Sequence, residues 1–92
     1  MEVRIAYRQH AGVPTPSKHS RHPVLTALGV SIRTRRKALG LSQEQLSDKA
    51  GLDRSYLGQI ERGENSIALL PLKAVADALE TTVATLMTEA GI

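Results

Sequence analysis

Apolar residues follow a helical spacing from residue 24 to the end of the chain. In the first segment they recur at steps of three to seven residues, at Leu25, Leu28, Ile32 and Leu39, which predicts one amphipathic face. Gly40 comes next, and glycine commonly ends a helix in the left-handed conformation. The pattern therefore predicts a first helix that begins at residue 24 and ends before Gly40.

A second predicted helix follows directly. The run Ser-Gln-Glu-Gln that begins at Ser42 is a capping box, in which the serine hydroxyl and the last glutamine satisfy each other's backbone N–H groups. This helix buries Leu46 and Ala50. Gly51 makes the turn that follows, and Asp53 is the predicted N-cap of a third helix.

The remaining apolar pattern predicts that the third helix ends at Gly63 and that two more follow. One covers residues 69–79 with Pro71 in its first turn, and the last begins near residue 83. Aromatic residues make up only 2 % of the chain, which favours small packed helices over a sandwich or barrel. The predicted fold class is all-α: a compact bundle of five short helices.

Residues 1–23 have a different character from this domain, which spans residues 24–92. Residues 3–7 alternate loosely and can form a short strand, whereas residues 9–23 contain turn-forming Gly, Pro and Ser between basic side chains. We therefore predict a flexible or extended N-terminal arm. Three roles stay open for it: reaching around the duplex or into the minor groove, pairing through residues 3–7 with another chain, or plain disorder.

Composition excludes several classes of protein. The 92 residues suffice for one domain, without a cleft between domains. The chain has no cysteine, which excludes disulfides and favours the cytoplasm. No apolar run approaches the length of a membrane span. The three histidines (His10, His19 and His22) all lie in the arm without a carboxylate or cysteine nearby, so no metal or cofactor is expected. No nucleophile–base pair or phosphate-cradling loop points to an enzyme.

Charge is distributed unevenly along the chain. Residues 1–23 and residues 24–63 each carry a net charge of +3, whereas residues 64–92 carry −3. One end of the molecule would therefore attract a polyanion and the other would repel it. This polarity is typical of a nucleic-acid binder that presents one face.

The second and third predicted helices form a helix-turn-helix candidate. The small Ser47 allows the helices to cross closely, and Gly51 allows the tight turn. The inner positions are apolar at Leu46, Ala50, Leu52, Leu57 and Ile60. The stretch 41–63 resembles the lambda-repressor/Cro-like helix-turn-helix family, and the similarity covers roughly residues 24–88. Residues 52–56 and 61–63 are especially similar to the controller proteins of restriction–modification systems.

The resemblance implies residue roles. Gln43 matches a glutamine that donates to a DNA phosphate, and Arg36 and Glu61 match a structural salt bridge. The helix that begins near residue 54 would lie in the major groove, with base-reading positions at Arg54, Ser55 and Gln59, and with Tyr56 between them. An arginine can bind O6 and N7 of guanine, and Gln59, expected on an exposed face, can bind N6 and N7 of adenine.

Further basic residues are expected to neutralise phosphates without reading the sequence. They are Arg33, Arg35, Lys37, Lys49 and Arg62. Gly58 departs from the pattern of a stable helix, because glycine costs about 1 kcal/mol there relative to alanine. It either brings the backbone close to DNA or softens a helix that orders on binding.

The predicted function is sequence-specific regulation of transcription, as a repressor or controller, by a homodimer on a palindromic operator in double-stranded DNA. The expected dimer surface is apolar and lies near the C-terminus, at Val83, Leu86, Met87 and Ile92. The alternative is an antitoxin-like interaction module that binds a protein partner through residues 1–23 and uses the same helix-turn-helix for autoregulation.

Overall fold

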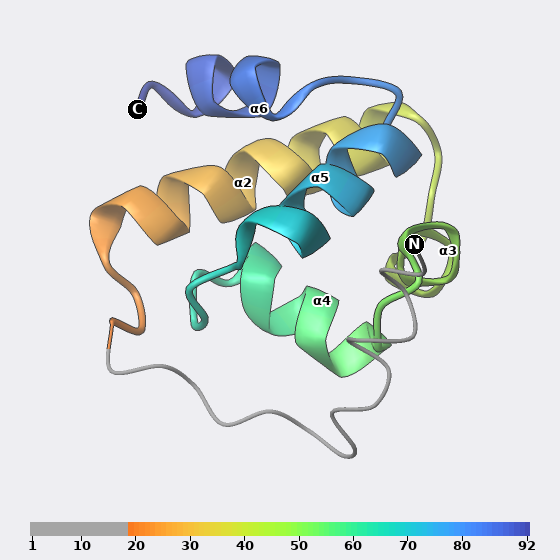
Figure 1. Cartoon of the computed structure of the whole chain (residues 1–92), viewed down its shortest axis with the longest axis horizontal. Helices are drawn as coiled ribbons and strands as arrows, with labels where there is room; N and C mark the ends of the chain where they lie inside the picture. The colour runs from red at the N-terminus through yellow and green to blue at the C-terminus, as the bar shows by residue number, and fades with distance from the viewer. Residues whose placement is uncertain (1–18) are drawn as a thin grey trace.

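The computed structural model describes residues 19–92, which form five helices (Figure 1). These are α2 (Pro23–Ala38), α3 (Gln43–Ala50), α4 (Arg54–Glu61), α5 (Leu69–Ala78) and α6 (Val83–Ala90). The described residues contain no strand, and the predicted all-α bundle is confirmed. The predicted strand at residues 3–7 and most of the predicted arm lie outside the described residues. Within residues 19–92 no helix is long and apolar enough to cross a bilayer.

Local signals at the ends of α2 and α3 act as the sequence predicts. The capping box of α3 is complete: the Ser42 hydroxyl accepts from Gln45 N–H at 3.0 Å, and Gln45 Oε1 accepts from Ser42 N–H at 2.8 Å. Gly51 ends α3 in the left-handed conformation with φ 74°. At the start of α2, His22 Nδ1 accepts from Val24 N–H at 3.1 Å. His22 is therefore a helix cap within the segment that we assigned to the arm.

One predicted detail of the helix-turn-helix differs from the structure. Asp53 occupies the N-cap position of α4, as predicted, but its side chain makes no capping hydrogen bond. In α3 the small Ser47 is buried, and its hydroxyl donates to the carbonyl of Glu44, three residues earlier, at 2.9 Å. This polar group is therefore satisfied within its own helix.

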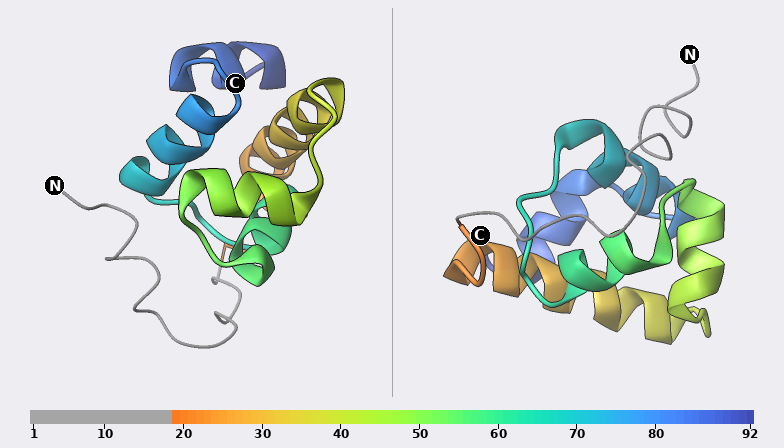
Figure 2. Two further views of the ribbon diagram at one scale, coloured as in Figure 1. Left: turned by 90° about the vertical axis from the view of Figure 1, so that its right-hand side faces the viewer. Right: turned by 90° about the horizontal axis from the view of Figure 1, so that it is seen from below.

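The core lies where α2 packs against α4 and α6, and where α3 packs against α4 and α5. Its fully buried members include Ile32, Leu46, Leu57 and Leu79. Leu86 is also 0 % exposed. The prediction that Leu86 lies on a dimer surface is therefore wrong, because this side chain fills the core that joins α6 to the rest of the domain. Figures 1 and 2 show α6 on the opposite side of α2 from α4.

Candidate nucleic-acid interface

The side chains in the first turn of α4 are accessible, as the candidate recognition helix requires. Arg54 is exposed, and Ser55 and Tyr56 are partly exposed. On the opposite face, Leu57 and Ile60 are buried against the core at 0 % and 2 % exposure. The buried face fixes the helix, so its N-terminal end presents the polar side chains outward.

Gln59 does not lie where the sequence predicted. The residue is only 5 % exposed, and its side chain accepts a hydrogen bond from Asn65 Nδ2 in the loop after α4. The same loop is held by Glu64 N–H, which donates to the Gln59 carbonyl at 2.9 Å. The expectation of an exposed Gln59 is therefore wrong, and base reading would require this side chain to leave its buried pair.

The predicted salt bridge between α2 and α4 is confirmed. Arg36 donates to both carboxylate oxygens of Glu61, at 2.7 and 3.0 Å, and also to the carbonyl of Leu41 at 2.8 Å. The two side chains are 9 % and 2 % exposed. The bidentate pair therefore ties α2 to the end of α4 inside the protein.

Gln43 extends this network to the surface. Its Nε2 donates to Glu61 Oε1 at 3.0 Å, and its Oε1 lies 3.4 Å from Arg54 Nη1. The first residue of α3 and the first residue of α4 therefore meet, and the buried ion pair holds the side chain that joins them. The sequence placed Gln43 and Arg54 in one site but did not show this connection.

The predicted phosphate contacts divide into separate groups. Three are exposed and have no ion-pair partner within residues 19–92: Arg33, Lys37 and Lys49. Arg35 does not belong with them. Its Nε donates to the carbonyl of Leu79 at 3.1 Å and its Nη2 to that of Glu80 at 3.3 Å, so it caps the C-terminus of α5.

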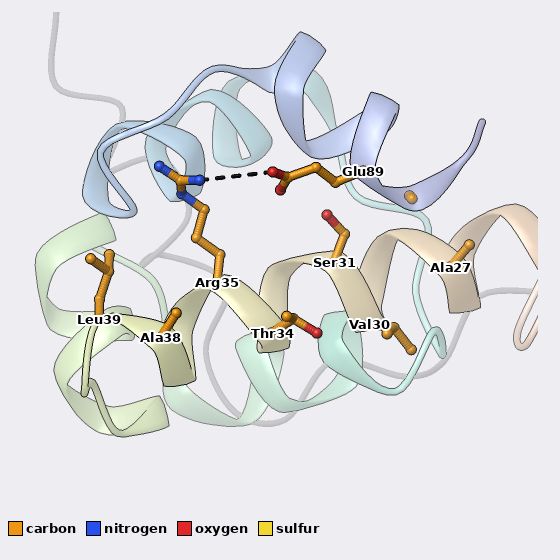
Figure 3. A pocket seen from close by; sticks show the side chains of 9 residues that line it. Ala27, Val30, Ser31, Thr34, Arg35, Ala38, Leu39 and Glu89 are labelled. Atoms are coloured by element: carbon orange, nitrogen blue, oxygen red, sulfur yellow. Dashed lines mark ion pairs between the residues drawn. The ribbon is translucent and has the colours of Figure 1, made fainter.

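Arg35 also borders a hollow of about 640 Å³ between α2 and the end of α6 (Figure 3). Its Nη1 lies 4.0 Å from Glu89 Oε2. The other lining side chains are small or apolar, including Ala27, Val30 and Ala38. Because α6 and α4 lie on opposite sides of α2, this hollow is separate from the candidate DNA face.

Arg62, the remaining predicted phosphate contact, belongs to a cluster that sequence reasoning missed. Its Nε and Nη2 donate to the two oxygens of Glu64 at 3.0 and 3.1 Å. Arg21 Nη2 donates to Glu64 Oε2 at 3.0 Å. The hydrogen bonds from Arg62 lower the pKa of Glu64 below its ordinary value. Glu64 therefore stays ionised between two guanidinium groups at neutral pH.

Of the expected dimer residues other than Leu86, Met87 and Ile92 are exposed at 37 % and 45 %, and Val83 is half-buried. Among residues 19–92, the most exposed large apolar residue is Leu69, at 69 %, at the start of α5. The sequence did not distinguish Leu69 from core leucines, because it stands at the beginning of an apolar run.

This chain is similar to known proteins in sequence and in fold. The helix-turn-helix family matches residues 32–86, more than half of the chain. The control protein C.SmaI of Serratia marcescens is 42 % identical over 65 residues, which are 71 % of this chain and 77 % of that protein. The crystal structure of the restriction–modification controller protein C.AhdI from Aeromonas hydrophila superposes with a TM-score of 0.66 at 42 % identity, over 67 % of this chain and 94 % of that one.

A structure determined with DNA is also similar. It is the master regulator for biofilm formation SinR, with a TM-score of 0.61 and 37 % identity over 64 % of this chain and 95 % of that one.

Proposed function

Because this chain belongs to the helix-turn-helix family of DNA-binding transcriptional regulators, we propose that it represses or controls a promoter as a homodimer on a palindromic operator. The observation that carries the proposal is the exposed first turn of α4 on a buried, ion-paired support. One helix reads only a few base pairs, whereas two copies related by a two-fold axis read two half-sites about 34–36 Å apart.

We assign direct reading of bases to the first turn of α4. Arg54 is exposed, and its Nη1 lies 3.4 Å from Gln43 Oε1. An arginine at this position can bind O6 and N7 of a guanine. Ser55 and Tyr56 follow it in the first turn of the helix. Gln59 is left out of this reading set because its side chain is buried with Asn65. The similarity to C.SmaI and C.AhdI supports a controller role.

Selection from a random duplex pool at about 0.15 M salt tests the operator. We expect a dyad-symmetric consensus with half-sites about one helical turn apart. Salt-sensitive binding without enrichment of any sequence would contradict the proposal and favour the protein-partner alternative.

Arg54→Ala tests base reading on that consensus. We expect specific affinity to fall by about 1–3 kcal/mol, with selectivity relaxed at one position of each half-site. Arg33→Ala is the matched control, since it also removes one exposed arginine; it should weaken binding to all duplexes and reduce the salt slope by about one. Equal losses on all sequences for Arg54→Ala would refute its base-reading role.

The dimer is proposed to form through the exposed apolar residues of α6 and the C-terminus. Met87→Glu would place a charge in that interface, so we expect the dimer dissociation constant to rise about tenfold or more, because 1.4 kcal/mol corresponds to tenfold. Sedimentation equilibrium measures the change. Leu69→Glu is the comparison, because it places the same charge on an exposed apolar residue outside α6, at the start of α5. A monomeric wild-type protein, or dissociation caused only by Leu69→Glu, would contradict the proposed interface.

A further inference from the structure

The guanidinium group of Arg62 lies against α4 at Gly58, a position of this helix that has no side chain. A Cβ atom built on Gly58 would lie 3.1 Å from Arg62 Nη1 and 3.7 Å from Gln43 Oε1. The absent side chain therefore leaves the space that Arg62 occupies. Gly58 does not have a positive φ, and it lies inside α4 rather than at its end. Neither of these common reasons for a glycine applies here, and the space for Arg62 is what this glycine provides.

Glu64 holds Arg62 in that place. Both of its carboxylate oxygens accept from Arg62, through Nε and Nη2, and the third guanidinium nitrogen, Nη1, is the one that lies over Gly58. Glu64 is itself held from the other side by Arg21, whose backbone N–H also donates to the Gly63 carbonyl at 2.6 Å. The Glu64 side chain is only 17 % exposed, although that of Arg62 is 52 % exposed.

The result is a row of donors on the candidate DNA face. Arg54 meets Gln43 at the start of α3 and α4, and both Arg62 Nη1 and Gln43 Oε1 lie close to Gly58, one turn further along α4. Two separate carboxylates hold these donors in place: Glu61 accepts a hydrogen bond from Gln43, and Glu64 accepts one from Arg62. A long side chain that is already oriented loses less conformational freedom when it binds.

We propose that Glu64 is a positioning residue for DNA binding, which holds Arg62 over Gly58 so that Arg62 contacts a phosphate beside Gln43. The proposal rests on the proposed function, since it assigns α3 and α4 to the DNA face. For this carboxylate, the proposal predicts the opposite of the ordinary electrostatic effect on DNA binding. A carboxylate near a polyanion repels it, so removing that charge would by itself strengthen binding.

Glu64→Gln tests the proposal by the sign of its effect. This variant keeps the size of the side chain but loses one acceptor oxygen and the charge, and we expect affinity for the wild-type protein's own selected duplex to fall about three- to tenfold. Glu89→Gln is the control for charge, because it removes one carboxylate on α6, on the other side of α2 from α4. Unchanged or tighter binding by Glu64→Gln, relative to this control, would overturn the proposal.

A double-mutant cycle shows whether Glu64 acts through Arg62. In an Arg62→Ala background, Glu64→Gln should no longer weaken binding, because no guanidinium remains to be held. Equal weakening in both backgrounds would overturn the proposal. Failure of the proposed function is a separate result: it would be seen with the wild-type protein, as an absence of any enriched sequence.

Gly58→Ala gives an independent readout. Its new Cβ atom would lie 3.1 Å from Arg62 Nη1, so this end of the guanidinium would have to shift slightly, while the helix itself would be favoured. We expect higher thermal stability together with slightly weaker binding to the same duplex, by up to about threefold. Tighter binding by this more stable variant would contradict the proposed position of Arg62.

Discussion

Replacing Arg36 by methionine should destabilise the domain by about 3–5 kcal/mol, because the Glu61 carboxylate would remain buried without its cation. The Glu61 side chain is 2 % exposed, and Gln43 Nε2 would remain as a donor to it. The loss is a large part of the roughly 5–15 kcal/mol that stabilises a typical domain. Urea unfolding followed by circular dichroism measures it.

The matched control removes both charges. An Arg36→Met, Glu61→Met protein buries no unpaired charge, so most of the stability lost in Arg36→Met should return. DNA binding should not return with it, because Gln43 would lose the acceptor that holds its amide. The single variant also has an outcome that would contradict this account. If Arg36→Met lowered the free energy of unfolding by less than about 1 kcal/mol, the usual contribution of an exposed ion pair, the Arg36–Glu61 pair would behave as a solvent-exposed one.

The ends of the helices were predictable because their causes are local. The capping box at Ser42 and the left-handed Gly51 each depend on a few neighbouring residues. The exposure of Gln59 was not predictable in this way. All five residues from Leu57 to Glu61 are buried. Gln59 is among them because the loop after α4 folds back and supplies Asn65. That contact is tertiary, and helical periodicity does not contain it.

The basic residues of α2 show, within one helix, what helical periodicity alone does not predict. Successive residues of a helix point in directions about 100° apart. Arg33 and Lys37 are exposed, Arg35 caps α5, and Arg36 is buried with Glu61. The sequence shows four similar cations, and the resemblance singled out only Arg36. Separating Arg35 from the others requires the position of the α5 C-terminus, which no residue near Arg35 specifies.

Gly29→Ala should destabilise the domain by about 1–3 kcal/mol, the usual cost of overpacking. Gly29 lies inside α2, where alanine would ordinarily be favourable. A Cβ atom there would lie 2.5 Å from the Glu61 carbonyl oxygen and 2.6 Å from that of Ile60. Both obstacles are backbone atoms of α4, so α2 and α4 would have to separate, which would also strain the Arg36–Glu61 pair. Thermal unfolding measures the loss.

Gly58→Ala is the matched control, because it is the same substitution inside another helix. Its Cβ atom would meet only the flexible end of Arg62 within 3.4 Å, so the intrinsic preference for alanine should dominate and stabilise the fold by up to about 1 kcal/mol. The two variants should therefore shift the melting temperature in opposite directions. If both raised it, the close approach of α2 and α4 at Gly29 would not hold in solution, and the support beneath the DNA face would be looser than the buried ion pair requires.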